Sequence, residues 1–169
     1  LEDRGEVRRG YFVDGLGAAQ FAVRDAVDRL REPPGEGGVV VVLSAVDPAQ
    51  PFGAALAWPD HSGRATRSPS ALVALVDGMP VVWFDRRSRH LIRFNVSTPA
   101  QVWATALADY LSGSRAGTSR SAALEIRRHD GGVVGNFDDG FRDELLTCGF
   151  VDTYRSLKWR PEGSVRGIK

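Results

Sequence analysis

The alternation of apolar and polar residues near the start of the chain predicts a strand, a helix and a second strand. Residues 6–13 are rich in β-branched and aromatic side chains, which is typical of a strand. Apolar residues then recur at helical spacing over 22–30, with charged residues between them. This helix should end before Pro33. The unbroken apolar run 39–43 predicts a strand buried on both faces.

The middle of the chain predicts an antiparallel meander. Asp77-Gly78 lies between two apolar runs and has the composition of a two-residue hairpin turn. The charged residues 85–89 predict a second turn. The expected strands are 52–58, 71–76, 80–84 and 90–94. With the strands before them, they predict a small barrel or a strongly curled sheet.

Helical spacing returns after Thr98-Pro99, which supplies an N-cap residue and a proline at the first helical position. The remaining chain predicts a strand at 123–128, a short strand at 133–134, a helix from Asp138 or Asp139 to before Gly149, and a strand at 153–160. We therefore expect an α+β fold. Its expected parts are a curled β-barrel or meander with packed helices (1–112), a linker (113–122), a small β-β-α-β unit (123–162) and a frayed tail (163–169).

Composition and length are those of a globular protein. The 169 residues fit one domain with a small appendage, and 43% are hydrophobic and 25% charged. No apolar run approaches the roughly 20 residues that span a bilayer. The first residue is Leu1 and the following residues are densely charged, which favours a piece of a longer protein over a secretory leader. We expect no membrane contact and a cytoplasmic location.

Few residues suggest metal or redox chemistry. Cys148 is the single cysteine, so a disulfide framework and a Cys-rich zinc site are excluded, and a buried core thiol is expected. His61, His90 and His129 are far apart in sequence and are interpreted as surface imidazoles. No metal site and no cofactor site are predicted.

Catalytic motifs are also absent. The sequence contains no phosphate-binding P-loop, and residues 14–19 lack the third glycine of a dinucleotide-binding loop. A DNA glycosylase needs as little as one carboxylate to activate water. Asp47 and Asp60 are the weak candidates for that role. Asp47 precedes Pro48 as in a turn, whereas Asp60 beside His61 has no evident structural reason.

The basic residues suggest nucleic-acid contacts. The net charge is only +1, but all basic residues except Lys158 and Lys169 are arginines. Four basic clusters stand near aromatic residues: Arg8-Arg9, Arg86/Arg87/Arg89, Arg127-Arg128 and Arg155/Lys158/Arg160. Arginines hold phosphate while bases stack on aromatic rings. The alternative is a solvated strand face with its aromatics in the core. The predicted nucleic-acid-binding residues are Arg86, Arg87 and Arg89 at a projecting turn, with Trp83, Arg8 and Arg9.

Several segments together resemble one protein family. Residues 9–22 read RGYFVDGLGAAQFA, 26–31 read AVDRLR, and 44–56 read SAVDPAQPFGAAL. With Trp58-Pro59, 71–78 and 146–159, these resemble the carboxy-terminal region of long-form large helicase-related (Lhr) proteins, with an actinobacterial origin. Two departures are the family's basic loop, reduced here to RATRSP at 64–69, and Ser156 in place of a glycine.

The resemblance implies a part of a superfamily 2 ATP-dependent DNA helicase that moves 3'-5' on single-stranded DNA and acts in repair. ATP and Mg²⁺ would bind motor domains that this sequence lacks. In the family, winged-helix domains precede the barrel. The favoured hypothesis is an accessory module that binds DNA or assembles a homo-oligomer. The alternatives are part of a DNA glycosylase formed with the upstream winged helices, and a purely structural oligomerisation domain.

Overall fold

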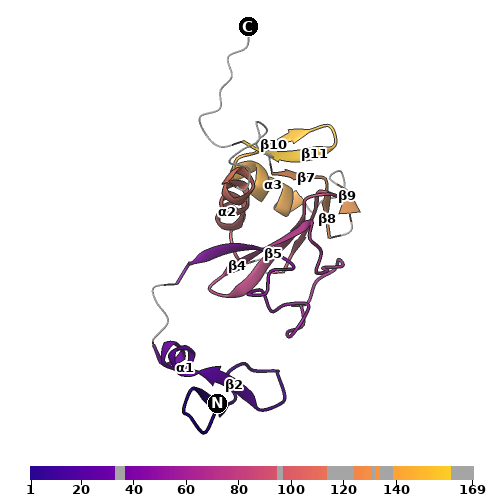
Figure 1. Cartoon of the computed structure of the whole chain (residues 1–169). Helices are drawn as coiled ribbons and strands as arrows, with labels where there is room; N and C mark the ends of the chain where they lie inside the picture. Colours follow the sequence, from indigo (N-terminus) through magenta and orange to yellow (C-terminus); the bar gives the residue numbers. More distant parts are fainter. Residues whose placement is uncertain (33–36, 95–96, 114–123, 131, 134–138, 161–169) are drawn as a thin grey trace.

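The structure is a computed structural model that describes residues 1–32, 37–94, 97–113, 124–130, 132–133 and 139–160 (Figure 1). Its helices are α1 (Arg24–Arg31), α2 (Ala100–Gly113) and α3 (Asp139–Thr147). Its strands are β1 (Val7–Gly10), β2 (Gln20–Val23), β3 (Val40–Ser44), β4 (Ala71–Val76), β5 (Met79–Asp85), β6 (His90–Arg93), β7 (Glu125–Ile126), β8 (Arg128–His129), β9 (Gly132–Val133), β10 (Phe150–Thr153) and β11 (Ser156–Trp159). The predicted α+β class is confirmed. None of the helices so described is long and apolar enough to cross a membrane.

Residues 1–32 form a hairpin and a helix, which we call the N-terminal unit. β1 pairs antiparallel with β2, and α1 follows β2 directly. The sequence predicted the first strand and the helix but not β2, because four strand residues run into the helical pattern without a break. In Figure 1 this unit lies apart from the rest of the described chain, which we call the body.

The body is built on a sheet of six strands in the order β3-β4-β5-β6-β8-β9. The predicted meander is present as β4-β5-β6, and the register of β4 and β5 shifts between Ala74 and Leu75. The sequence left a small barrel and a strongly curled sheet as alternatives, and the described strands form an open sheet, with β3 and β9 at its two edges. After β6 it is extended by β8, which runs parallel to β6 and comes from far along the chain.

The turn between β4 and β5 shows why this hairpin forms. Asp77 and Gly78 both have positive φ, at 50° and 81°, as a two-residue hairpin turn requires. The Asp77 carboxylate also accepts hydrogen bonds from the backbone N–H groups of Gly38 and Val39. One turn residue therefore fixes both the hairpin and the start of β3.

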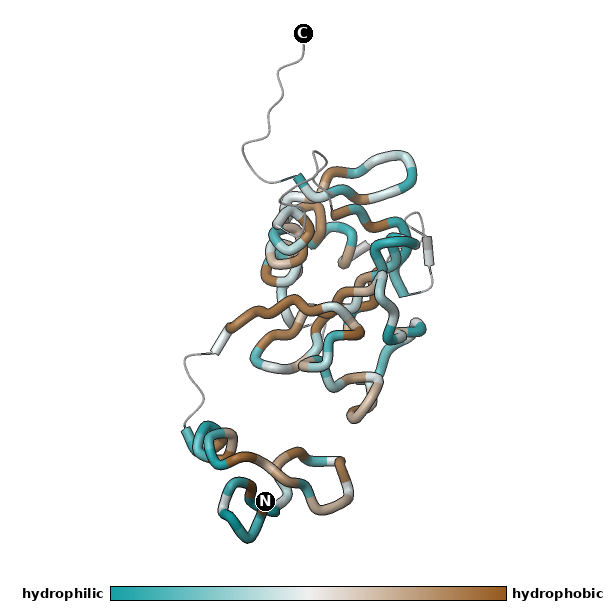
Figure 2. The backbone as a smooth tube through the Cα atoms, in the orientation of Figure 1, coloured by the Kyte–Doolittle hydropathy of each residue, from teal (hydrophilic) through white to brown (hydrophobic). Residues whose placement is uncertain are grey.

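The two faces of the sheet carry two separate cores. One face packs against α2 and α3, with Trp103, Leu107 and Phe84 completely buried. The other is covered by the chain segment 45–70, which brings Phe52 and Trp58 onto Trp83 and Ile92. Figure 2 shows the corresponding hydrophobic segments in the strands and α2, and others in the N-terminal unit.

The strand predicted at 52–58 is not formed. The segment is a turn with a single bridge between Phe52 and Leu56. The buried Gln50 side chain holds it by bonding the backbone N–H and carbonyl of Phe52. The apolar pattern here reflects packing onto the sheet, where Trp58 stacks on Phe94.

The C-terminal segment is part of the body rather than a unit beside it. Leu124, Ile126, Leu145 and Leu157 lie in the same core as α2. In addition, the Glu144 carboxylate of α3 accepts a hydrogen bond from the first backbone N–H of α2 and pairs with Arg93 of β6 at 2.7 Å. Of the predicted linker (113–122), all but residue 113 lies outside the described residues. The predicted frayed tail (163–169) lies wholly outside them.

The last part of the chain differs from its prediction in one important respect. Instead of a single strand over 153–160, two strands, β10 and β11, form a hairpin whose partners include Thr153 and Ser156. Tyr154 and Arg155 form the turn between them. Neither is a turn-favouring residue, so the sequence reads as one continuous strand. β11 also pairs antiparallel with β7, so that β10, β11 and β7 form a separate three-stranded sheet.

Candidate nucleic-acid interface

The turn between β5 and β6 is organised by one buried carboxylate. Asp85 accepts hydrogen bonds from the backbone N–H groups of Arg87 and Ser88 and from the hydroxyls of Ser88 and Ser70. Burial raises the pKa of Asp85, but these hydrogen bonds lower it by more, so its pKa lies below the ordinary value of 3.8. The carboxylate is therefore ionised and holds the basic turn in one shape.

The three predicted arginines of this turn have different roles. The Arg86 side chain donates to the carbonyls of Pro69 and Ser70 and is part of the scaffold. Arg87 is exposed. Arg89 is half-buried and has a positive φ of 58°. Its carbonyl oxygen accepts hydrogen bonds from the N–H groups of Arg127 and Arg128, at 2.8 and 3.2 Å.

Those two bonds bring together basic clusters that are almost forty residues apart in sequence. Arg127 and Arg128 are both exposed beside the β5–β6 turn. Their placement follows from the parallel pairing of β8 with β6, which the sequence pattern does not reveal.

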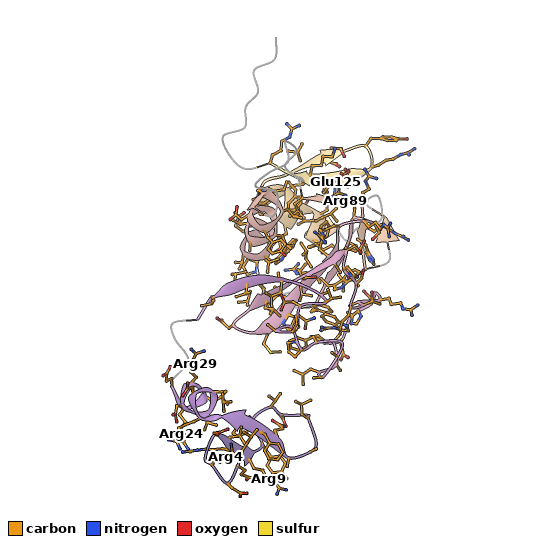
Figure 3. All side chains as sticks on the ribbon, in the orientation of Figure 1. Arg4, Arg9, Arg24, Arg29, Arg89 and Glu125 are labelled. Atoms are coloured by element: carbon orange, nitrogen blue, oxygen red, sulfur yellow. The ribbon has the colours of Figure 1, made fainter. Side chains whose placement is uncertain are left out.

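A third cluster joins them through Glu125. Lys158 of β11 lies opposite Glu125 of β7 in the sheet register. Burial raises the pKa of Glu125, but a hydrogen bond from Ser156, a hydrogen bond and charge from Arg127, and the charge of Lys158 lower it by more. Glu125 and Arg89, both labelled in Figure 3, are linked by Arg127, whose backbone N–H donates to the Arg89 carbonyl and whose guanidinium donates to the Glu125 carboxylate. We call this surface the basic edge; it consists of Arg87, Arg89, Arg127, Arg128, Arg155 and Lys158.

The charge of the basic edge contributes to a lowered pKa of the neighbouring His90 imidazole. Burial lowers the pKa of His90, and the nearby Arg128 guanidinium lowers it further, while Asp130 and Asp85 partly oppose this. His90 is therefore neutral at pH 7. Its ring also lies edge-on to Trp83, with ring centroids 5.9 Å apart.

Three of the predicted nucleic-acid positions lie elsewhere. Trp83 is only 4% exposed and its indole N–H donates to the Thr66 carbonyl, so the hypothesis that its ring faces a base needs correction: the ring belongs to the core. Arg8 and Arg9 are exposed on β1, in the N-terminal unit, where Arg9 is labelled in Figure 3. The structure does not bring them to the basic edge.

The weak catalytic candidates have turn and surface positions. The Asp47 carboxylate accepts a bond from the Ala49 N–H, as expected for a turn residue. Asp60 is exposed. The two ring nitrogens of the adjacent His61 contact the Pro59 carbonyl and the Ala65 N–H, which explains His61 structurally. This arrangement leaves no ring nitrogen of His61 for an acid–base pair with Asp60.

The other chemical predictions concern thiols and metals. Cys148 is half-buried against the core, and burial together with the Glu144 charge raises its pKa to about 11, as expected of an unreactive thiol. The three histidines are each partly buried rather than fully exposed. Among the described residues, no three His, Cys, Asp or Glu side chains cluster as metal ligands would.

Sequence reasoning missed a hollow in the loop between β1 and β2. Its volume is about 570 Å³ and its lining includes Tyr11, Asp14 and Gln20. The Gln20 side chain shapes it by bonding the N–H groups of Phe12 and Val13 and the carbonyl of Val13, at 2.8 to 2.9 Å. Gly15 and Gly17, which have positive φ, were the signal for such a loop.

Comparisons with known proteins agree with the resemblance that the sequence segments indicated. Residues 1–40 match the family described as "Large helicase-related protein, winged-helix domain". Over 95% of its length the chain is 43% identical to the "Lhr helicase/ probable uracil glycosylase" of Mycolicibacterium smegmatis. The chain corresponds to a region of the large helicase-related proteins. The "Lhr helicase/uracil glycosylase" of Escherichia coli is 37% identical over 54% of the chain.

This correspondence covers only a small part of each relative. The chain spans 11% of the length of the mycobacterial relative, and its match to the Escherichia coli relative covers 6% of that protein. The resemblance to large helicase-related proteins is confirmed. The winged-helix match also extends to residue 40, across the N-terminal unit that the sequence had assigned to the start of a barrel.

Proposed function

We propose that this chain is a DNA-binding accessory region of a large helicase-related repair protein, and that the basic edge contacts the DNA backbone. The observation that carries the proposal is the convergence of basic residues from β8, β11 and the β5–β6 turn. Exposed arginines suit phosphate because their guanidinium groups present several donors in one plane. The relatives are named as helicases, which act on nucleic acid.

The rest of the proposed function concerns the whole protein. We propose that ATP and Mg²⁺ act in motor domains outside this chain, that the motor moves 3'-5' on single-stranded DNA, and that the protein works in the cytoplasm. Upstream winged-helix domains are the proposed intramolecular partner. Phe21 and Leu30 of the N-terminal unit are 61% and 62% exposed and offer apolar area for such a contact. A homo-oligomer is the competing use of the same area, and sedimentation of the chain at several concentrations separates the two.

The DNA-binding proposal is tested by charge reversal across the basic edge. Fluorescence anisotropy with a labelled single-stranded oligonucleotide, over a salt series, measures affinity and the number of phosphates contacted. We expect Arg87→Glu/Arg128→Glu to weaken binding and to reduce the salt slope by about 1.4, since each single-strand phosphate contact contributes about 0.7.

A matched control distinguishes loss of a specific DNA site from a general effect of the changed net charge. Arg29→Glu/Arg31→Glu changes the charge equally, on the exposed face of α1. This control should leave affinity within about twofold, because charges far from the bound DNA are screened beyond about 10 Å at 0.1 M salt. Equal losses for both double variants would reject the basic edge as the DNA site.

Base excision is a second candidate function. The observation that favours it is the hollow bordered by Asp14, since a carboxylate beside a bound base can activate water. Release of uracil from a single-stranded oligonucleotide should then fall with Asp14→Asn and persist in Asp47→Asn and Asp60→Asn. If Asp14→Asn released uracil at the unchanged rate, the hollow would have no catalytic role.

A further inference from the structure

The basic edge ends at an aromatic side chain that the body leaves in solvent. Tyr154, in the turn between β10 and β11, is 93% exposed, more than any other large hydrophobic side chain in the described residues. Most tyrosines bury much of the ring, and a ring held in solvent offers apolar area and a flat face to a partner. Only two residues separate its neighbour Arg155 from Lys158 on β11.

The turn holds this ring on a fixed support. The Thr153 hydroxyl donates to the Ser156 carbonyl at 2.7 Å and lies 2.8 Å from the Ser156 hydroxyl, which closes the hairpin. Arg142 of α3 forms an ion pair with Asp152 of β10. A side chain on a braced hairpin loses less conformational freedom on binding than one on a loose loop.

A cation covers the same ring. The Arg155 guanidinium carbon lies 5.4 Å from the Tyr154 ring centroid, within the range of a cation–π contact. The flat guanidinium and the ring together form a stacking platform with a positive charge beside it. Such a platform matches a nucleobase whose phosphate is close by.

We infer that the Tyr154–Arg155 turn binds an unpaired nucleobase of single-stranded DNA, while the basic edge holds the backbone that leads to it. This inference rests on the proposed DNA-binding function and adds a preference for single strands. Bases in a duplex are stacked on one another and present no free face, whereas those of a single strand do. The arginines of the basic edge would by themselves bind both forms.

The experiment compares the full 169-residue chain with its variants on two probes, a thymidine oligonucleotide and a duplex of equal length. Tyr154→Ala should weaken single-strand binding about tenfold, as expected for the loss of one stacked base, and leave duplex binding unchanged. Tyr154→Phe keeps the ring and should restore single-strand binding. An oligonucleotide with one 2-aminopurine should lose fluorescence on binding the wild type but not Tyr154→Ala.

The N-terminal unit supplies a matched control. Phe21 is an exposed aromatic residue, at 61%, on β2, outside the lining of the hollow, and Phe21→Ala should preserve both affinities. Unchanged single-strand affinity in Tyr154→Ala, or equal losses on both probes, overturns the inference. If Arg87→Glu/Arg128→Glu weakens binding while Tyr154→Ala does not, DNA binding stands and only the base site falls. If the wild type binds neither probe, both proposals fall.

Discussion

The N-terminal unit and the body are stabilised in different ways. In the N-terminal unit Val27 is the one described side chain that is buried, and several large apolar side chains are exposed. The body buries apolar residues on both faces of its sheet and ties its helices together through Glu144. The difference teaches that hairpin pairing and local hydrogen bonds shape the unit, whereas a core shapes the body. A unit of this kind gains stability when a partner covers it.

The largest expected effect comes from removing a core ring of the body. Trp103 is completely buried, so Trp103→Ala should lower the free energy of unfolding by about 3–5 kcal/mol. The counterpart in the N-terminal unit, Val27→Ala, should cost less, about 1–2 kcal/mol, since it removes only two buried methyl groups. Urea unfolding followed by far-UV circular dichroism measures both.

Trp103→Phe is the control for ring loss. Within the described part of the chain, the indole N–H of Trp103 has no hydrogen-bond partner, so phenylalanine removes an unsatisfied donor as well as volume. It should cost clearly less than alanine. A Val27→Ala effect as large as that of Trp103→Ala would break the comparison between unit and body.

The next effect concerns two glutamines that each clamp a loop. Gln50 is 1% exposed in the body and bonds the carbonyls of Ala45 and Phe52. Gln50→Ala should lower global stability by about 2–3 kcal/mol, because buried backbone groups lose their partners. Gln20→Ala should instead speed amide exchange of Phe12 and Val13 about tenfold and leave exchange in the body unchanged.

Hydrogen exchange by NMR separates these outcomes residue by residue. Gln101→Ala, on the exposed face of α2, serves as the control, because among the described residues its exposed side chain bonds the Thr105 hydroxyl alone. Global destabilisation by Gln20→Ala would show that the unit and the body unfold together, contrary to the comparison.

A moderate, pH-dependent effect is expected at Asp85. Asp85→Ala should cost about 2 kcal/mol at pH 7, as for the loss of hydrogen bonds to a charged group. Because the folded-state pKa is lowered, the unfolded chain takes up the proton more readily. This stabilisation is thus present above pH 3.8 and is lost as the pH falls through the lower folded value.

Thermal unfolding at pH 7 and at pH 3 checks this prediction. The destabilisation by Asp85→Ala should shrink at the lower pH. Asp60→Ala removes an exposed carboxylate and should change the melting temperature little at either pH. A pH-independent loss in Asp85→Ala would assign its role to packing rather than charge.

The smallest expected effect is on the rate at which a disulfide reagent labels Cys148, which lies in the body. With its pKa raised to about 11, Cys148 should react with a disulfide reagent at pH 8 much more slowly than a free thiol. The chain has no other cysteine, so the labelling rate follows opening of the body. Val27→Ala should leave that rate unchanged and Trp103→Ala should raise it. Faster labelling in Val27→Ala would couple the unit to the body.

Local patterns predicted many of the elements. The Asp77-Gly78 turn, the meander and α2 follow from turn chemistry and periodicity, which act over a few residues. The β10–β11 hairpin was missed because Tyr154-Arg155 resembles strand rather than turn. The sequence could not decide between a barrel and an open, curled sheet, because that depends on which strand follows β6 in the sheet, and β8 is separated from β6 by a helix and a long connection.

Part of the candidate site could also be predicted from the sequence, and part could not. Sequence reasoning identified Arg86, Arg87 and Arg89 as a basic turn, but it could not show that Arg86 bonds the scaffold. Trp83 was assigned to the surface because an aromatic residue beside arginines is compatible with both a core and an exposed strand face. Burial decides between them, and burial depends on the segment 45–70 that covers this face.

By itself the sequence determined the α+β class, the basic clusters and the likeness to large helicase-related proteins, because these lie in composition and in short contiguous segments. Tertiary structure alone decided that three of those clusters form one edge with Tyr154 at its end. That grouping rests on two backbone hydrogen bonds to Arg89 and on the register of β7 with β11. Such pairings join residues distant in the chain, and backbone groups are the same in every residue, so no local pattern encodes them.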